Sequence, residues 1–173
     1  MNKQEIDQKV PVNRRKFFLT NTSNPEDHGY SREQVLDMLN IVAEYDEHEA
    51  FNDPGFVNDI GTFFEDGVCV EKDIDQAVYW YERAVALGDD LAKSNLADVL
   101  RKGTLGYPKD LKRAFELYKS CHLPYAYYRV GEFYEYGWGV EKDVEKAKEN
   151  YRIAYREDHA LAKRKLKEFD FLH

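Results

Sequence analysis

The side chains that most often carry enzyme chemistry are few in this chain and lie far apart. The five histidines have no second ligand at the spacing that binds a metal ion: His28, His48, His122, His159 and His173. The two cysteines, Cys69 and Cys121, form no CxxC pair, so we expect free thiols in a reducing compartment. No phosphate-binding loop, HExxH zinc motif or GxSxG nucleophile motif is present. The sequence therefore predicts no catalytic residue, no metal site and no cofactor.

Two places still invite a chemical interpretation. His48 lies among Asp46, Glu47 and Glu49, but on a helix these side chains do not converge on one cation. A solvated acidic helix face is the favoured interpretation. Cys69 remains open as a reactive thiol, although no basic residue is placed to lower the pKa of its sulfur.

Composition indicates a folded chain with much surface. Of the 173 residues 34% are charged and the mean hydropathy is −0.73, yet 13 Tyr, 10 Phe and two Trp argue against disorder. An elongated repeat protein has a large surface and a thin core that aromatic side chains cover, so it accounts for both the high charge and the many aromatic residues. The net charge of −8 disfavours binding to a nucleic-acid backbone and favours a basic protein partner.

The sequence contains neither a transmembrane segment nor a complete export signal. No segment reaches the length of a transmembrane helix. The pair Arg14-Arg15 resembles a twin-arginine export signal, but the polar stretch 20–27 follows it where an apolar run is needed. We therefore expect a cytoplasmic protein with no membrane contact and no small-molecule substrate.

An internal repeat is the strongest pattern in the sequence. Shifting the chain by 70 residues superposes Gly61 on Gly131, Tyr81 on Tyr151, and the run 70–73 on the run 140–143, which has the same four residues. A weaker copy lies between the two, around Ala97 and Tyr118, so the period is half of that shift. Three copies agree in register.

Each copy has the pattern of two helices. In the third copy, Ala126, Val130, Phe133 and Tyr134 share one helical face, and Gly137 follows as a left-handed C-terminal residue. The second helix of each copy begins after an aspartate N-cap, at Asp73, Asp110 and Asp143. Carboxylates such as Glu71 and Asp73 recur with the repeat, so they are interpreted as structural rather than as an acid–base pair.

Small residues predict how the two helices meet and where the stack ends. Gly61, Ala97 and Gly131 let the second helix approach closely, which offsets a cost of ~1 kcal/mol for glycine inside a helix. Lys167 takes that position in the last helix and cannot admit a following one. Residues 158–170 are therefore predicted to form a lone capping helix, with these side chains turned to water: Lys163, Arg164, Lys165 and Lys167.

The spacing from Ala126 to Ala154, with Gly131, Gly137, Gly139 and Asp143 between, resembles a Sel1-like repeat, a relative of the tetratricopeptide repeat. The resemblance covers about residues 54–169. It is weaker in the second copy, where Leu100 replaces the usual tyrosine and Pro124 closes the turn 120–123. The resemblance implies an all-α, right-handed superhelical solenoid of about three helix pairs, with an N-terminal helix and a C-terminal capping helix.

Domain boundaries follow from the repeat and from the flanking composition. Residues 1–30 are predicted to be extended or partly disordered, and Ser31 and Gln34 form a capping box for an N-terminal helix. Pro54 suits the first position of the next helix. The predicted segments are 1–30, the N-terminal helix 31–53, repeats 54–90, 91–124 and 125–160, and the capping segment 161–173.

A second ridge on the first helix of each repeat is the candidate partner-binding site. In tetratricopeptide-like proteins the matching ridge lines the concave surface, and the resemblance carries this over by position. The alternative, that the tyrosines pack only between helices, is equally favoured for each one. Glu65 and Arg101 accompany the predicted ridge residues: Asn58, Thr62, Asp66, Ser94, Asp98, Lys102, Tyr128, Glu132, Glu135 and Tyr136.

The resemblance implies a non-catalytic protein-interaction module. The specific hypothesis is an immunity or antitoxin-like protein that neutralises a cognate basic toxin, such as a nuclease, and its motivation is the size and charge of the chain. The alternative is an adaptor or scaffold that binds peptides or helices in a signalling or secretion pathway. A thiol enzyme that uses Cys69 is the third hypothesis.

Overall fold

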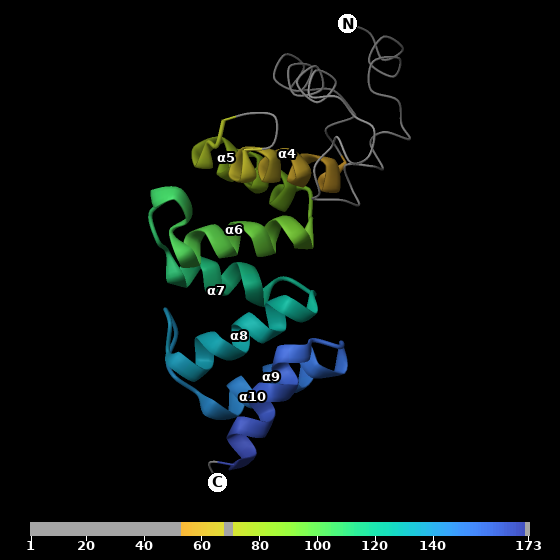
Figure 1. Ribbon diagram of the computed structural model, residues 1–173, viewed down its shortest axis with the longest axis vertical. Helices are drawn as coiled ribbons and strands as arrows, with labels where there is room; N and C mark the ends of the chain where they lie inside the picture. The colour runs from red at the N-terminus through yellow and green to blue at the C-terminus, as the bar shows by residue number, and fades with distance from the viewer. Residues whose placement is uncertain (1–52, 68–70, 172–173) are drawn as a thin grey trace, which may run out of the picture. The chain divides into compact units, whose positions relative to one another are not determined.

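The computed structural model describes residues 53–67 and 71–171, and within these ranges all the regular structure is helical (Figure 1). The predicted extended segment 1–30 and the predicted helix 31–53 lie outside the described residues, apart from Asp53. The chain divides into two compact units, residues 1–89 and 90–173. In the first unit, α4 (Pro54–Asp66) packs against α5 (Ile74–Ala86).

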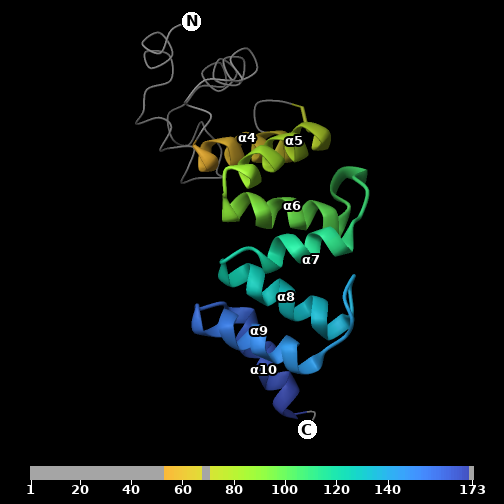
Figure 2. The same cartoon turned by 180° about the vertical axis from the view of Figure 1, so that it is seen from behind.

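The second unit contains five α-helices that pack in chain order. They are α6 (Asp90–Lys102), α7 (Leu111–Lys119), α8 (Pro124–Tyr136), α9 (Val144–Arg156) and α10 (Ala160–Phe171), with a short 3-10 helix, η3 (Thr104–Gly106), after α6. From α7 to α10, each α-helix packs against the one before it, and views from opposite sides show this order (Figures 1 and 2). The predicted helix pairs α4–α5, α6–α7 and α8–α9 are thus present, and α10 follows as a single helix.

The predicted aspartate caps begin the second helix of every pair. The side chains of Asp73, Asp110 and Asp143 accept hydrogen bonds from the backbone N–H three residues later, at 3.0, 2.9 and 3.0 Å. The backbone N–H of each aspartate also donates to a carbonyl near the end of the first helix, at 2.9, 3.0 and 2.9 Å. One residue therefore ends the loop, starts the second helix and ties it to the first.

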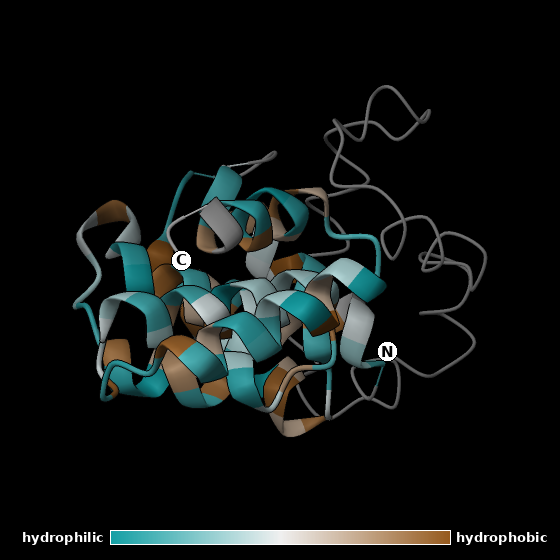
Figure 3. Ribbon diagram, turned by 90° about the horizontal axis from the view of Figure 1, so that it is seen from below, coloured by the Kyte–Doolittle hydropathy of each residue, from teal (hydrophilic) through white to brown (hydrophobic). Residues whose placement is uncertain are grey.

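Amphipathic faces build the core. Colouring by hydropathy shows apolar and polar residues alternating around the helices (Figure 3). The predicted stripe of α9, Ala147, Tyr151 and Ala154, is fully buried, as are Ala126 and Phe133 of α8. Gly137 ends α8 with φ 71°, the left-handed conformation predicted for it.

The glycines inside the first helices are required by close packing. A Cβ atom on Gly61 would lie 2.5 Å from the ring of Tyr81, and one on Gly131 would lie 2.6 Å from the ring of Tyr151. Neither space can hold a methyl group without movement. The prediction that small residues let the second helix approach is therefore confirmed at these two positions.

Two local details differ from the sequence-based expectation. Pro124 is the first residue of α8, because a missing N–H costs nothing in the first turn of a helix. The prediction that Lys165 faces water is wrong: its side chain is only 11% exposed and reaches back to α8. Lys163, Arg164 and Lys167 are exposed, as predicted.

Gly131→Ala should lower the free energy of unfolding by about 1–3 kcal/mol, because the added methyl group overlaps the ring of Tyr151. The measurement is urea unfolding followed by circular dichroism. Ala97 occupies the equivalent register position and is buried, so Ala97→Gly is the matched control, with an expected cost of only ~1 kcal/mol from glycine in a helix. An unchanged or higher stability of Gly131→Ala would contradict the packing account.

Candidate interaction surface

The predicted ridge of the first unit is mostly buried. Asn58 is buried and donates to the Asp59 carboxylate at 3.4 Å, and the Thr62 hydroxyl donates to the Asp59 carbonyl at 2.8 Å. Asp66 is exposed at the end of α4. Burial, with the charges of Asp89 and Asp53 adding to it, raises the pKa of Asp59 to about 7 against the opposing hydrogen bond from Asn58. Of the three predicted residues here, only Asp66 is fully available to a partner.

In the second unit, the ridge residues divide between buried and exposed. Ser94 and Tyr128 are buried, and Asp98, Glu132 and Glu135 are half-buried. Lys102 is exposed, and Tyr136 is 48% exposed at the end of α8. The structure therefore brings most of the predicted residues into contact with other side chains of the same unit. The binding role of the ridge stays a prediction.

One hydrogen bond recurs in all three helix pairs and explains part of this burial. The phenol of the buried tyrosine in the second helix donates to a carboxylate of the first helix: Tyr81 to Glu65 at 2.7 Å, Tyr118 to Asp98 at 2.5 Å, and Tyr151 to Glu135 at 2.5 Å. The sequence-based predictions did not include this tyrosine–carboxylate hydrogen bond. The recurrence of Tyr81 and Tyr151 sixteen residues after Glu65 and Glu135 was the available signal.

Asp98 connects three helices. Besides Tyr118 of α7, its carboxylate accepts hydrogen bonds from Tyr125 of α8 at 2.9 Å, and from Arg101 and Lys102 of its own helix at 2.8 Å each. Burial alone would raise the pKa of Asp98, but the hydrogen bonds from Lys102, Tyr118 and Arg101 outweigh it and lower that pKa to about 2. The side chain is a structural anion at neutral pH.

A chain of aromatic and charged contacts continues along α8. The Arg129 guanidinium lies 4.7 Å from the ring centroid of Tyr125 and forms an ion pair with Glu132 at 2.5 Å. Glu132 also accepts a hydrogen bond from Tyr128, whose ring stacks on His159 at a centroid distance of 4.6 Å. Tyr128 and Glu132 are therefore held in place before any partner arrives.

The end of α8 carries a more accessible cluster. Lys165 of α10 donates to Glu135 at 3.0 Å and to the Tyr136 hydroxyl at 2.7 Å, and Tyr136 stacks on Trp138 at a centroid distance of 4.9 Å. Lys165 joins the capping helix to the third repeat through this contact, which explains its burial. The sequence pattern alone did not indicate it, because one lysine among four gives no periodic signal.

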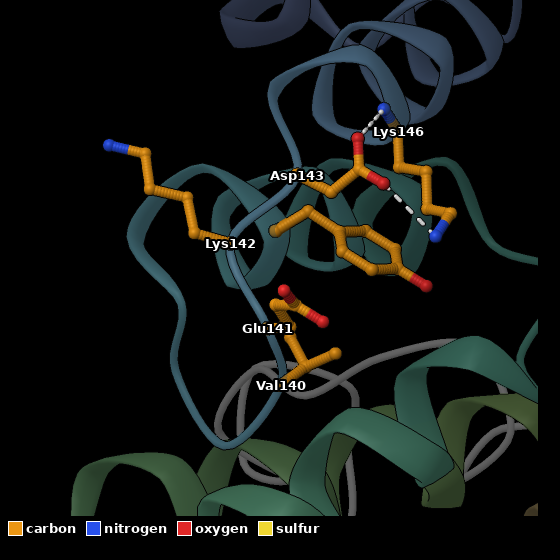
Figure 4. Close-up of a pocket in the computed structure, with 6 residues that line it drawn as sticks. Val140, Glu141, Lys142, Asp143 and Lys146 are labelled. Atoms are coloured by element: carbon orange, nitrogen blue, oxygen red, sulfur yellow. Dashed lines mark hydrogen bonds and ion pairs between the residues drawn. The ribbon is translucent and has the colours of Figure 1, made fainter.

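A hollow of about 360 Å³ lies beside the loop between α8 and α9 (Figure 4). Asp143 caps α9 and forms an ion pair with Lys146 at 3.0 Å, and the Lys146 ammonium lies over the ring of Tyr134. Lys142 points away from the hollow in this view. Glu141 also lines the hollow, so its charges are of both signs and it presents no surplus of cations to an anionic ligand.

Charge is divided unequally along the chain. Residues 1–89 contain 19 Asp and Glu against 8 Lys and Arg, a net charge of −11, whereas residues 90–173 contain 14 against 17, a net charge of +3. The acidic character predicted for the whole chain thus belongs to its first half. Attraction of a basic partner stays a prediction, and this distribution of charge favours the first half of the chain for it.

Other kinds of site find little support in the described part of the chain. No group of three metal-ligating side chains occurs among the residues described, and His48 and Cys69 lie outside them. Cys121 is buried, with its thiol 3.1 Å from the carbonyl of Asp90. None of the described helices is long and apolar enough to cross a bilayer.

Asp98→Asn should destabilise the second unit by about 1.5–3 kcal/mol at pH 7, because charge-assisted hydrogen bonds to three helices are lost. The lowered pKa means that this contribution is full above pH ~4 and disappears as pH falls through about 2. Denaturant unfolding at pH 7 and pH 2.5 should therefore show a large difference between wild type and variant only at pH 7. Glu149→Gln, an exposed position of α9, is the control; an equal effect of both variants would refute a special role for Asp98.

Comparison with known proteins agrees with this architecture. The Sel1 repeat model matches residues 58–89, 91–120 and 124–159, which together are more than half of the chain. Protein sel-1 homolog 2 of Mus musculus is 30% identical over 96 residues, which are 52% of this chain and 14% of that protein. The Rattus norvegicus protein of the same name is 29% identical over 96 residues. The chain thus spans a small part of the length of these relatives.

Solved structures show the same fold. The crystal structure of a Sel1 repeat protein from Oxalobacter formigenes has a TM-score of 0.64 and 27% identity, over 76% of this chain and 98% of that one. The structure of c5321, a protective antigen of uropathogenic Escherichia coli strains with an SLR fold, has a TM-score of 0.72 and 20% identity, over 94% and 34%. The predicted all-α repeat solenoid is confirmed. With three matched copies over more than half of its length, this chain belongs to the Sel1 repeat family.

Proposed function

We propose that this chain is a protein-interaction module that attracts a basic protein partner to its first repeat. The support comes from the family, whose helical repeats form interaction surfaces, and from the charge of the first unit. The observation that carries the proposal is a difference between the first and third repeats, which share one register.

The third repeat neutralises the carboxylates at the start of its second helix, and the first repeat does not. In α9, Lys146 pairs with Asp143 at 3.0 Å and Lys148 pairs with Glu145 at 3.1 Å. The equivalents of the two lysines in α5 are Gln76 and Val78, neither of which carries a charge. Asp73 and Asp75 thus lack these partners and are exposed.

Further carboxylates add to this acidic surface, which we define as Asp66, Glu71, Asp73 and Asp75. All four are exposed and lie at the turn that joins α4 to α5. None of the four forms an ion pair with another residue that the structure describes, and the Asp73 side chain caps α5. An uncompensated surface of this kind accelerates encounter with a cationic partner and makes its binding sensitive to salt.

The specific form of the proposal is an immunity-like role, in which the chain covers and inactivates one basic toxin such as a nuclease. Its support is the local excess of negative charge in the first repeat. The alternative is an adaptor that binds several peptides or helices, with the exposed ridge residues Lys102 and Tyr136 as contacts. A cytoplasmic location accompanies both forms as a prediction.

Neutralising the acidic surface should weaken binding to a basic probe. We expect the triple variant Asp66→Asn, Glu71→Gln, Asp75→Asn to bind a fluorescent octa-arginine peptide about tenfold more weakly at 50 mM salt, measured by anisotropy. The triple variant Glu116→Gln, Glu149→Gln, Glu157→Gln makes the same charge change on exposed positions of the second unit. Equal losses in the two variants would show that only total charge matters and would overturn the assignment to the first repeat.

Co-expression with the product of a neighbouring reading frame separates the two forms of the proposal. An immunity-like role predicts a one-to-one complex with a basic protein, nanomolar affinity by calorimetry and loss of that protein's activity. An adaptor predicts micromolar binding to several unrelated peptides, weakened by Tyr136→Ala. The thiol-enzyme hypothesis instead predicts loss of function in Cys69→Ser, with the fold intact. Absence of any salt-sensitive binding to basic proteins would refute the proposal as a whole.

A further inference from the structure

One departure of the second repeat from the other two concerns the carboxylate that accepts the tyrosine hydroxyl. The register that places Glu65 in α4 and Glu135 in α8 places Arg101 in α6. In those two repeats the glutamate accepts the tyrosine hydroxyl. The second repeat keeps the tyrosine bond by another route, because Asp98, one helical turn earlier, accepts from Tyr118.

Because Asp98 accepts the Tyr118 hydroxyl, the position of Arg101 can hold a cation without loss of the hydrogen bond to the tyrosine. Arg101 forms a hydrogen-bonded ion pair with Asp98 at 2.8 Å and lies 3.3 Å from the Tyr118 hydroxyl. It then lines a hollow of about 230 Å³ together with Lys109, Leu111 and Trp138. The walls come from the end of α6, the start of α7 and the loop after α8, all within the second unit.

The hollow is cationic and has one aromatic wall. Lys109 is exposed and has no ion-pair partner in the described part of the chain, and its stem packs on Gly103, where a Cβ would lie 3.0 Å from Cγ. Trp138 has two aromatic neighbours: Tyr136 stacks on it at 4.9 Å, and the ring of Phe133 lies nearly perpendicular to it at a centroid distance of 5.8 Å. Asp98, which pairs with Arg101, also accepts hydrogen bonds from Lys102 and two tyrosines.

We propose that this hollow binds an acidic peptide segment of a partner protein, with a carboxylate side chain between Arg101 and Lys109 and its methylene groups against Trp138. Charge complementarity supports this occupant, since the second unit carries a net charge of +3 and two cations line the hollow. The surface is distinct from the acidic one of the first repeat.

Repeat register supplies a matched control for the experiment. Lys142 occupies in the third repeat the position that Lys109 occupies in the second, is equally exposed, and points away from the neighbouring hollow (Figure 4). Lys109→Glu and Lys142→Glu therefore make the same charge change at equivalent loop positions. Only the first alters the proposed site.

The probe is an acetylated hexaglutamate peptide, and the readout is the indole N–H signal of Trp138 in a ¹⁵N-labelled full chain. The chain has two tryptophans, so a spectrum of Trp80→Phe assigns the signal. We expect hexaglutamate, and not hexaglutamine, to shift the Trp138 signal. Lys109→Glu should weaken the binding about tenfold, while Lys142→Glu changes it less than twofold. Lys109→Arg should retain it.

A titration that leaves the Trp138 signal unmoved, or that Lys142→Glu weakens as strongly as Lys109→Glu, would overturn the proposal and point to general attraction by exposed lysines. Arg101→Gln, checked by thermal unfolding, tests the second cation without placing a new anion beside Asp98. The acidic-surface triple variant of the first repeat should bind hexaglutamate like wild type. Failure of the basic-partner proposal can therefore be told apart from failure of this one.

Discussion

A tyrosine of each second helix meets a close-approach position on the first helix and donates its hydroxyl to a carboxylate of that helix. The ring needs a small residue opposite it, and Gly61 and Gly131 leave room that a methyl group would fill. The hydroxyl needs an acceptor, and Glu65, Asp98 and Glu135 provide it. Because a buried phenol without a partner is costly, the two requirements together fix both the distance and the rotation of the paired helices. The aspartate cap then fixes where the second helix starts.

This constraint also limits which residues are free to evolve toward a partner. The carboxylates of the predicted ridge serve the tyrosines and neighbouring cations first, so few of its side chains face solvent. The charged side chains that remain available lie at loop ends and exposed turns. In the first repeat these are carboxylates without an ion pair among the described residues, and in the second they are cations near Trp138. The two repeats therefore offer surfaces of opposite sign to a partner.

The fold was largely predictable from the sequence because its signals are periodic. Glycines, tyrosines and aspartate caps recur in register, and three copies make chance agreement improbable. Side-chain networks were less predictable. Nothing in the sequence distinguishes Lys165 from the other lysines of α10, yet the fold places it against Glu135 and Tyr136. Spacing also does not decide whether Tyr128 lies in the core or on the surface. The location of the negative charge could have been found from the sequence by counting each half separately. The proposed binding residue Arg101 is a departure from the repeat. Its role could not be inferred from the sequence alone, because it depends on Asp98 accepting the tyrosine hydrogen bond in place of a glutamate.

The tyrosine–carboxylate bonds join residues that are only 16 or 20 positions apart. Such short loops cost little entropy to close, and chains dominated by near-neighbour contacts reach their native state quickly. Every helical hairpin can therefore begin to form as soon as its own residues have left the ribosome, without waiting for the rest. Synthesis from the amino end would then form the helical hairpins one at a time, in the order in which they are made.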